Sequence, residues 1–171
     1  MSNITRQQAT RACQNCKKGQ TLFEMVIALA VVVLVITGIV KAVTTAIKNS
    51  TFARNKSEAT RYGQEALEWV KTERDKKSWS NFTANVGNLT TSSGVCMPTL
   101  VFPTSSSSCD TSLDSNKIQN AIFFREIKVL DEGTSSCTSS DTSCNITVEV
   151  FWLDGETTHT STLETRMTNW R

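Results

Sequence analysis

The organisation of this chain is decided by one stretch, Lys17-Lys18-Gly19-Gln20-Thr21-Leu22-Phe23-Glu24, which directly precedes the uncharged run of residues 25–40. Two cations, a small residue and one carboxylate therefore border an apolar segment of nearly membrane length. Residues 1–19 are polar and basic, and the chain beyond the apolar segment is rich in Ser, Thr and Asn. We expect a leader over residues 1–19, a long helix over residues 20–77 and a small head domain over residues 78–171.

The apolar segment is expected to form the first half of the long helix. With its flanks it covers residues 20–47, enough for the roughly 20 residues that cross a bilayer. Lys17 and Lys18 favour a cytoplasmic N-terminus by the positive-inside bias, which places the head outside the cytoplasm.

The second half of the helix is expected to be amphipathic over residues 52–77. Its apolar residues recur at three- and four-residue spacing, which predicts one buried stripe made of Phe52, Ala59, Tyr62, Gly63, Ala66 and Val70. Two oppositely charged pairs are four residues apart and are expected to meet on the wet face, namely Arg61 with Glu65 and Glu73 with Lys77.

The head is expected to be an antiparallel sheet. Alternating apolar and β-branched residues predict strands at residues 95–102, 121–130, 145–153 and 158–168. Asp154-Gly155 predicts a tight hairpin turn, and residues 78–94 are expected to be a linker or irregular loop. One face of the sheet needs a cover, and the amphipathic half of the helix supplies it. The predicted fold class is α+β, with a long N-terminal helix packed against a small antiparallel sheet.

The six cysteines fall into two groups. Cys96, Cys109, Cys137 and Cys144 lie in the small, core-poor head, where an even number predicts disulfides outside the cytoplasm. Three pairings are possible, and Cys96–Cys109 with Cys137–Cys144 is preferred because each pair encloses a short polar loop. Cys13 and Cys16 form a C-x-x-C pair in the leader, and without a second pair they do not define a metal site.

Charge and composition argue against nucleic-acid binding and against catalysis. Removal of the leader's four cations leaves 14 basic and 16 acidic residues, so the mature chain is weakly acidic and nucleic acid is an unexpected partner. The single histidine, His159, is expected to be a surface or hairpin residue. Because no catalytic triad, dyad or phosphate-binding loop is visible, we expect neither an enzyme nor a cofactor.

Gly19, the following Thr21-Leu22-Phe23-Glu24 and the uncharged run together resemble the start of type IV prepilins and pseudopilins. The resemblance implies cleavage by a prepilin peptidase between Gly19 and Gln20, with Lys17 and Lys18 holding the site at the cytoplasmic membrane surface. It also implies that Glu24 pairs with the new α-amine of Gln20 in a neighbouring chain and so sets the axial register. The implied partners are the peptidase, other pilin subunits bound through the N-terminal helix, and an inner-membrane assembly platform.

Two departures from the family's pattern bear on its subclass. Gln20 stands where major pilins usually carry Phe, which leaves N-terminal methylation open, and no proline interrupts residues 20–77. Both favour a minor pilin or pseudopilin, made as a single-pass protein of the cytoplasmic membrane and assembled into an extracellular or periplasmic filament. The alternative is a monomeric, signal-anchored extracytoplasmic binding protein.

Overall fold

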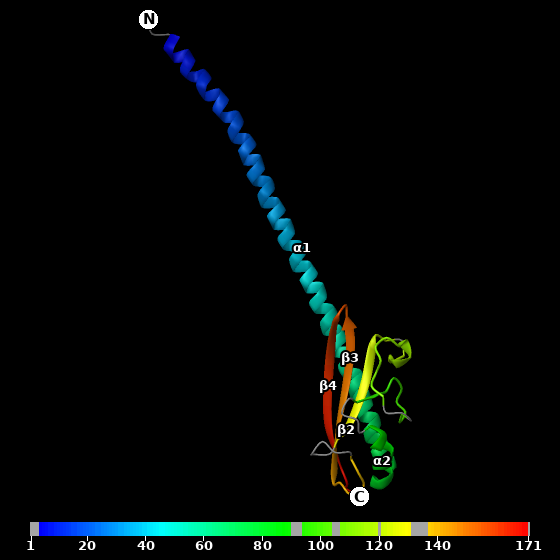
Figure 1. The fold of residues 1–171 in the computed structure, drawn as a ribbon. Coiled ribbons are helices and arrows are strands. Elements are labelled where there is room, and N and C mark those ends of the chain that lie inside the picture. The colour runs from blue at the N-terminus through cyan, green and yellow to red at the C-terminus, as the bar shows by residue number, and fades with distance from the viewer. Residues whose placement is uncertain (1–3, 90–93, 104–106, 120, 131–136, 171) are drawn as a thin grey trace. The chain divides into compact units, whose positions relative to one another are not determined.

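The computed structural model describes residues 4–89, 94–103, 107–119, 121–130 and 137–170, with side chains from Thr21 onward except that of Asn88. The chain divides into two compact units, Met1–Thr51 and Phe52–Arg171, and the first helix contributes to both. Figure 1 shows the elements, which are α1 (Ile4–Lys76), α2 (Trp79–Val86), η1 (Gly87–Leu89), β1 (Val95–Cys96), η2 (Asp114–Asn116), β2 (Phe123–Leu130), β3 (Ser143–Asp154) and β4 (Thr157–Thr168).

Helix α1 ends at Lys76, one residue before the predicted end, but it begins at Ile4 rather than at Gln20. The helix therefore includes most of the predicted leader. The leader has no proline and is built largely from residues that a helix tolerates, such as Gln, Ala, Arg and Lys. Its polar composition argued against a membrane segment and carried no signal against a helix.

The sheet has four antiparallel strands in the order β1-β2-β3-β4. Within each strand, alternate side chains point to opposite faces. One face is buried and carries Phe123, Arg125, Ile127 and Val129 from β2, Ile146, Val148, Val150 and Trp152 from β3, and Ser161, Leu163 and Met167 from β4.

The second half of α1 covers this buried face, as the sequence predicts. Ala59, Ala66 and Val70 are fully buried and belong to the same core cluster as the strands. At Gly63 an added Cβ would come within 2.6 Å of Leu163 Cδ1, so glycine allows close approach of the helix to β4. Phe52 is an exception, because 45% of its surface is exposed. The α+β fold class, a helix packed on a small antiparallel sheet, is confirmed.

The predicted irregular loop at residues 78–94 is wrong in its first half, where α2 forms. Ser78 caps this helix, since its side chain accepts a hydrogen bond from the Asn81 backbone N–H at 3.4 Å. Trp79, Phe82 and Val86 recur at helical spacing and are buried in the core. Their burial stabilises a helix that the polar composition of the segment had hidden.

Two β predictions also need correction. The strand expected over residues 95–102 stops at Cys96, and one further ladder bond joins Met97 N to Arg125 O at 2.8 Å. Pro98 follows and lacks the N–H that would continue the ladder. The hairpin loop is Gly155-Glu156 rather than Asp154-Gly155, because Asp154 still pairs with Thr157. Gly155 supplies the positive φ of 63°.

Of the two predicted ion pairs on α1, one forms and one does not. Lys77 Nζ lies 2.9 Å from Glu73 Oε2, as expected. Arg61 instead lies 4.0 Å from Glu58, and Glu65 lies 4.0 Å from Arg125 of β2. Glu65 thus pairs with Arg125 of the sheet instead of Arg61 of its own helix. The spacing along the helix could not indicate this more distant partner.

Two disulfides staple the head, Cys96–Cys109 and Cys137–Cys144. Their Cα–Cα distances are 4.6 Å and 5.8 Å, within the normal range for disulfides. These are the same pairs that the sequence analysis prefers. The first bond ties the short strand β1 to the loop before η2, and the second ties the start of β3 to the loop before it.

Candidate assembly and membrane segment

The apolar part of α1 exposes large hydrophobic side chains around its whole circumference. Between Leu22 and Ile47 every large apolar side chain is 48–71% exposed. Each Val, Leu or Ile that becomes buried contributes about 1.5–3 kcal/mol, so such a surface is strongly unfavourable in water. By length and composition α1 is the one helix among the described residues that could cross a membrane. An apolar helix of this kind near the N-terminus is consistent with a membrane anchor.

The polar groups of this segment are largely satisfied inside the helix itself. The hydroxyls of Thr37, Thr44 and Thr45 donate to the backbone carbonyls of Leu34, Val40 and Lys41 at 2.9, 2.8 and 3.0 Å. A hydroxyl bonded in this way does not need water or lipid as a partner. The threonines therefore leave the segment compatible with an apolar environment.

Two adjacent residues of this apolar surface, Thr37 and Gly38, have small side chains. A Cβ added to Gly38 would meet nothing within 4 Å, so the glycine leaves an open notch in the helix surface. Thr37, its hydroxyl already bonded to Leu34 O, is a second small residue beside the notch. Small residues of this kind let apolar helices approach each other closely.

Glu24 is the only charged residue in this part of the described side chains before Lys41, and it is exposed. It follows Gln20 by four residues, one helical turn, so both positions lie on the same face of α1. A carboxylate in an apolar environment is costly, about 2.5–3.5 kcal/mol at the centre of a bilayer, unless it finds a partner.

The remaining predicted site residues lie just before the described side chains. The backbone of Lys17, Lys18, Gly19 and Gln20 is helical as part of α1, and their side chains lie outside the described residues. Within the helix Gly19 is a weak point, because glycine is about 1 kcal/mol less favourable there than alanine. Cys13 and Cys16 also lie in this part of α1, outside the described side chains.

The comparisons with known proteins address this segment alone. A family model described as the prokaryotic N-terminal methylation motif matches residues 14–40. No curated protein and no solved structure matches the chain. The matched motif is that of the type IV pilin class III leader, so this segment is similar to the start of pilin-like precursors.

The head contains a buried arginine that the sequence analysis missed. Arg125 is only 2% exposed. Its Nε donates to Met97 O at 3.0 Å and its Nη1 to Tyr62 O at 3.3 Å, so it links β2, the segment after β1 and α1. Burial lowers the pKa of the guanidinium, an effect that the nearby Glu65 carboxylate partly offsets. Its alternation with Phe123 and Ile127 was the available signal, since an arginine between two core positions of a strand must point inward.

A second buried arginine, Arg74, lies where the last turn of α1 meets the end of β4. Arg74 is 2% exposed and lies between the rings of Trp79 and Trp170, at 5.1 and 5.5 Å from their centres. It donates to Lys77 O at 3.4 Å and to Thr168 O at 3.3 Å. It therefore joins the last turn of α1 to the end of β4, where a cation also suits the negative pole of the helix.

His159 lies on the buried side of β4 near the hairpin, not on the surface alone. It contacts Phe52 edge-on at 5.1 Å and Trp152 at 5.3 Å. This environment is an aromatic cluster made with Phe52 and Trp152. Among the described residues, no group of three or more His, Cys, Asp and Glu side chains is placed to hold a metal ion.

Proposed function

We propose that this chain is a structural subunit of a type IV pilus-like filament or pseudopilus, inserted as a precursor and assembled through α1. The observation that carries the proposal is one helix that combines the motif at residues 14–40 with an apolar surface exposed all round and a lone carboxylate at Glu24. A surface of this kind has two compatible environments, lipid before assembly and other apolar helices after it.

Cleavage after Gly19 would convert the precursor into the assembling form. A peptidase needs extended backbone in its site, and glycine at position 19 makes the helical conformation less favourable there than alanine would. The new α-amine of Gln20 would then be a cation one helical turn from Glu24. In a neighbouring chain the same two groups are complementary charges in an apolar setting, so their pairing would select one axial register.

The head agrees with an extracytoplasmic location. Its two disulfides persist in oxidising compartments. Lys17 and Lys18 favour the cytoplasmic side for the N-terminus, and the two arguments are independent. Gln20 and the uninterrupted course of α1 favour a minor pilin or a pseudopilin over a main subunit.

The proposal is tested by the mass of the mature chain and by its assembly. Co-expression with a prepilin peptidase should yield a chain whose first residue is Gln20, as read by intact-mass measurement and N-terminal sequencing. A mature chain that begins at Met1 or Ser2 would contradict the proposal and favour the monomeric anchored protein.

Substitution Glu24→Ala tests the role of the carboxylate. The variant should insert and be cleaved normally, but its yield in sheared or detergent-extracted multimers should fall on the order of a hundredfold. Removal of one member of a desolvated ion pair costs about 3–5 kcal/mol, which supports a loss of that size. The matched control is Glu68→Ala, at an exposed carboxylate on the amphipathic half of α1. Normal incorporation of Glu24→Ala into multimers would contradict a role for Glu24 in assembly.

A further inference from the structure

The second unit carries an open groove along α1 at the end of the head where the β3–β4 hairpin lies. The groove has a volume of about 670 Å³, and its lining residues in the described part of the chain all belong to α1, namely Phe52, Ala53, Lys56, Ser57, Thr60, Arg61 and Gln64. A second hollow of about 350 Å³, lined by Arg54, Ser57, Glu58 and Arg61, shares two of these residues. The surface therefore combines an exposed aromatic ring with three cations.

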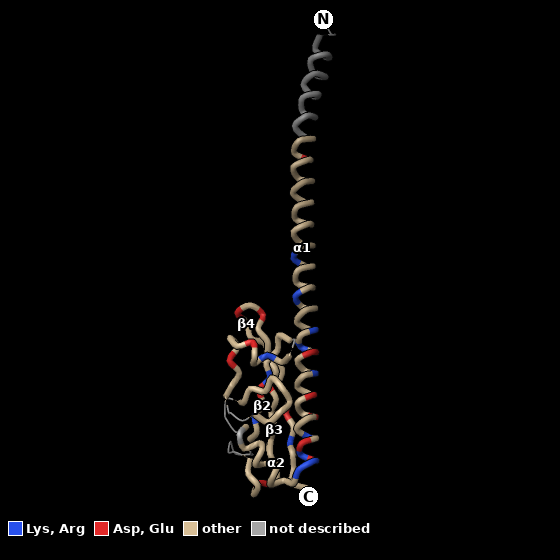
Figure 2. Tube along the Cα trace, turned by 90° about the vertical axis from the view of Figure 1, so that its right-hand side faces the viewer, with Lys and Arg blue, Asp and Glu red and all other residues tan. Residues whose placement is uncertain are grey.

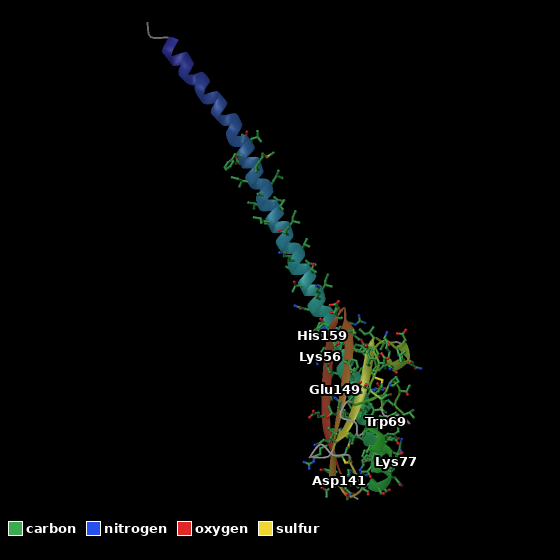
Figure 3. The ribbon with its side chains drawn as sticks, in the orientation of Figure 1. Lys56, Trp69, Lys77, Asp141, Glu149 and His159 are labelled. Atoms are coloured by element: carbon green, nitrogen blue, oxygen red, sulfur yellow. A yellow bond between two sulfur atoms is a disulfide. The ribbon has the colours of Figure 1, made fainter. Side chains whose placement is uncertain are left out.

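These cations are poorly neutralised within their own chain. Between Lys41 and Arg61 the sequence has five basic residues and only one acidic residue, Glu58. Glu58 lies 4.0 Å from Arg61, and Arg54 has no ion pair among the described residues. Lys56 is held in place by a hydrogen bond of 2.7 Å from its Nζ to Thr160 O (Figure 3).

The tip of the β3–β4 hairpin has the complementary chemistry. Asp154 is the last residue of β3 and Glu156 lies in the two-residue loop; both are exposed, and neither forms an ion pair among the described residues. Leu153, next to them, is 41% exposed. The tip thus presents one apolar side chain and two carboxylates, and the groove presents one apolar ring and cations.

The tip does not fill the groove of its own chain. Its neighbours Trp152 and His159 contact Phe52, with ring centres 6.0 and 5.1 Å apart, and Lys56 bonds to Thr160 O, so β4 runs in the same direction as α1. The tip therefore lies two to three strand residues before the level of Phe52, roughly 7–10 Å at 3.3 Å per residue. Arg54 and Arg61 lie two and nine residues further along α1, which corresponds to roughly 3–14 Å at 1.5 Å per residue. A parallel copy displaced along the axis by both distances together, roughly 10–24 Å, would place its tip beside this groove.

We propose that the groove at residues 52–64 receives the hairpin tip, residues 153–156, of a second copy of this chain. The inference rests on the proposed function, which supplies parallel packing of α1 helices, and it requires only two adjacent copies. Leu153 packs against Phe52 and Ala53, while Asp154 and Glu156 face Arg54, Lys56 and Arg61. The contact adds a register-setting interaction in the heads, separate from the one proposed for Glu24.

Intermolecular disulfide formation tests the geometry. Two forms of the full chain are co-expressed with a prepilin peptidase, one carrying Ser57→Cys and the other Glu156→Cys, so that a bond between these sites can only join two copies. The expected result is a band at twice the subunit mass, about tenfold stronger than in the control pair. In the control, Ser140→Cys, in the exposed turn before β3, replaces Glu156→Cys.

Charge reversal tests the chemistry. Asp154→Lys with Glu156→Lys should weaken the contact between the hairpin tip and the groove, because like charges then face each other, and the multimer yield of this variant should fall about tenfold. Arg54→Glu with Arg61→Glu should lower the yield to a similar extent for the same reason. The four changes combined should restore the yield to near that of the parent chain. Glu68→Lys with Asp75→Lys, at exposed carboxylates elsewhere on α1, is the matched control and should change the yield little.

The outcomes separate this inference from the proposed function. Multimers that form in the parent chain but resist both reversals, with no cross-link above control, would overturn the contact and leave the assembly role intact. A loss with Arg54→Glu and Arg61→Glu that the hairpin reversal does not rescue would assign the cations to another anion, such as lipid headgroups, and would also overturn it. Absence of multimers from the cleaved parent chain would overturn both proposals.

Discussion

At the scale of single residues, the two most informative positions are charged side chains in apolar surroundings, Glu24 and Arg125. Glu24 stands out in the sequence because no other charge interrupts the segment around it. Arg125 does not stand out by composition, yet it is buried and holds three parts of the head together. The difference is that the cost of Glu24 follows from its neighbours along the chain, whereas the role of Arg125 depends on carbonyls supplied by distant segments.

Substitution Arg125→Met should destabilise the head by about 3 kcal/mol. The change keeps much of the side-chain volume but removes charge-assisted hydrogen bonds to Met97 O and Tyr62 O and leaves these carbonyls short of donors. Thermal unfolding of the full chain in detergent, followed by circular dichroism, measures the loss. Arg54→Met, at an exposed arginine on α1, is the control and should lie within about 0.5 kcal/mol of the parent. Equal effects of the two variants would contradict a linking role for Arg125.

At the scale of elements, α1 is one helix with two kinds of surface. Figure 2 shows a long stretch of α1 without Lys, Arg, Asp or Glu, followed by a stretch rich in both signs. The uncharged part is exposed among the described residues and suits lipid or other helices. The charged part is amphipathic and packs on the sheet. Its packing can be tested at Gly63, and its electrostatics can be tested separately at Glu73 in the last turn.

Gly63→Leu should lower the stability of the head by about 1–3 kcal/mol, because a larger side chain must enter a packed interface. The Leu163 side chain already lies 2.6 Å from where a Cβ would stand. Addition of Leu163→Ala should recover part of the loss, measured by thermal unfolding. Gly38→Leu is the matched control, since nothing lies within 4 Å of its Cβ position, and it should leave the head unaffected while reducing multimer yield. An unchanged melting temperature for Gly63→Leu would refute the close helix–strand approach.

The last turn of α1 should contribute a small, pH-dependent stabilisation. A hydrogen bond from Lys77, reinforced by Lys76, holds the pKa of the Glu73 carboxyl below its ordinary value, against the opposing effect of burial. Because the folded-state pKa is lowered, the stabilisation is present above the ordinary carboxyl pKa of about 4.3 and is lost as the pH falls through the lowered value.

Glu73→Gln should therefore be less stable than the parent by up to about 1 kcal/mol at pH 7, as expected for a partly exposed pair. The difference should shrink to nothing as the pH is lowered below about 4. Urea unfolding at a series of pH values measures this difference, with Glu68→Gln as the control. A difference between parent and Glu73→Gln that stays constant across the series would argue that the glutamate acts through packing rather than charge.

At the scale of the whole molecule, a small core is supplemented by covalent links. The core joins α1, α2, β2 and β3, with β1 and β4 at the sheet edges. One disulfide closes a loop that starts in β1, and the other closes a loop that ends in β3. Sequence separations of 13 and 7 residues correspond to roughly 3 and 2.5 kcal/mol of stabilisation in the chain-entropy model.

Removal of each disulfide by paired Cys→Ser substitution should lower the unfolding free energy by amounts of this order. The Cys96/Cys109 pair should have the larger effect, because its loop is longer. Chemical denaturation of the two double variants, with and without reductant, measures both losses. In each variant reductant should remove only the contribution of the disulfide that remains. A variant insensitive to reductant would show that its remaining cysteines are not bonded.

The sequence by itself determined the features that depend on local pattern. Length and the absence of charge define the apolar segment, three- and four-residue spacing defines the stripe on α1, and alternation defines β2, β3 and β4. The motif at residues 14–40 likewise lies in one continuous stretch, so no folding is needed to recognise it. These properties follow from backbone geometry and from hydrophobicity, which act between near neighbours.

Only the tertiary structure decided what depends on distant partners. Helix α2 exists because Trp79, Phe82 and Val86 find a core to enter, and Arg125 takes its place because Met97 and Tyr62 supply carbonyls. The choice among the three possible disulfide pairings left open by the sequence, the ion pair of Glu65 with Arg125 instead of Arg61, and the contact of Trp152 and His159 with Phe52 have the same origin. Hydrogen bonds, ion pairs and packing energies of this kind arise only when folding brings separate segments within a few ångströms, and no pattern along the chain encodes those distances directly.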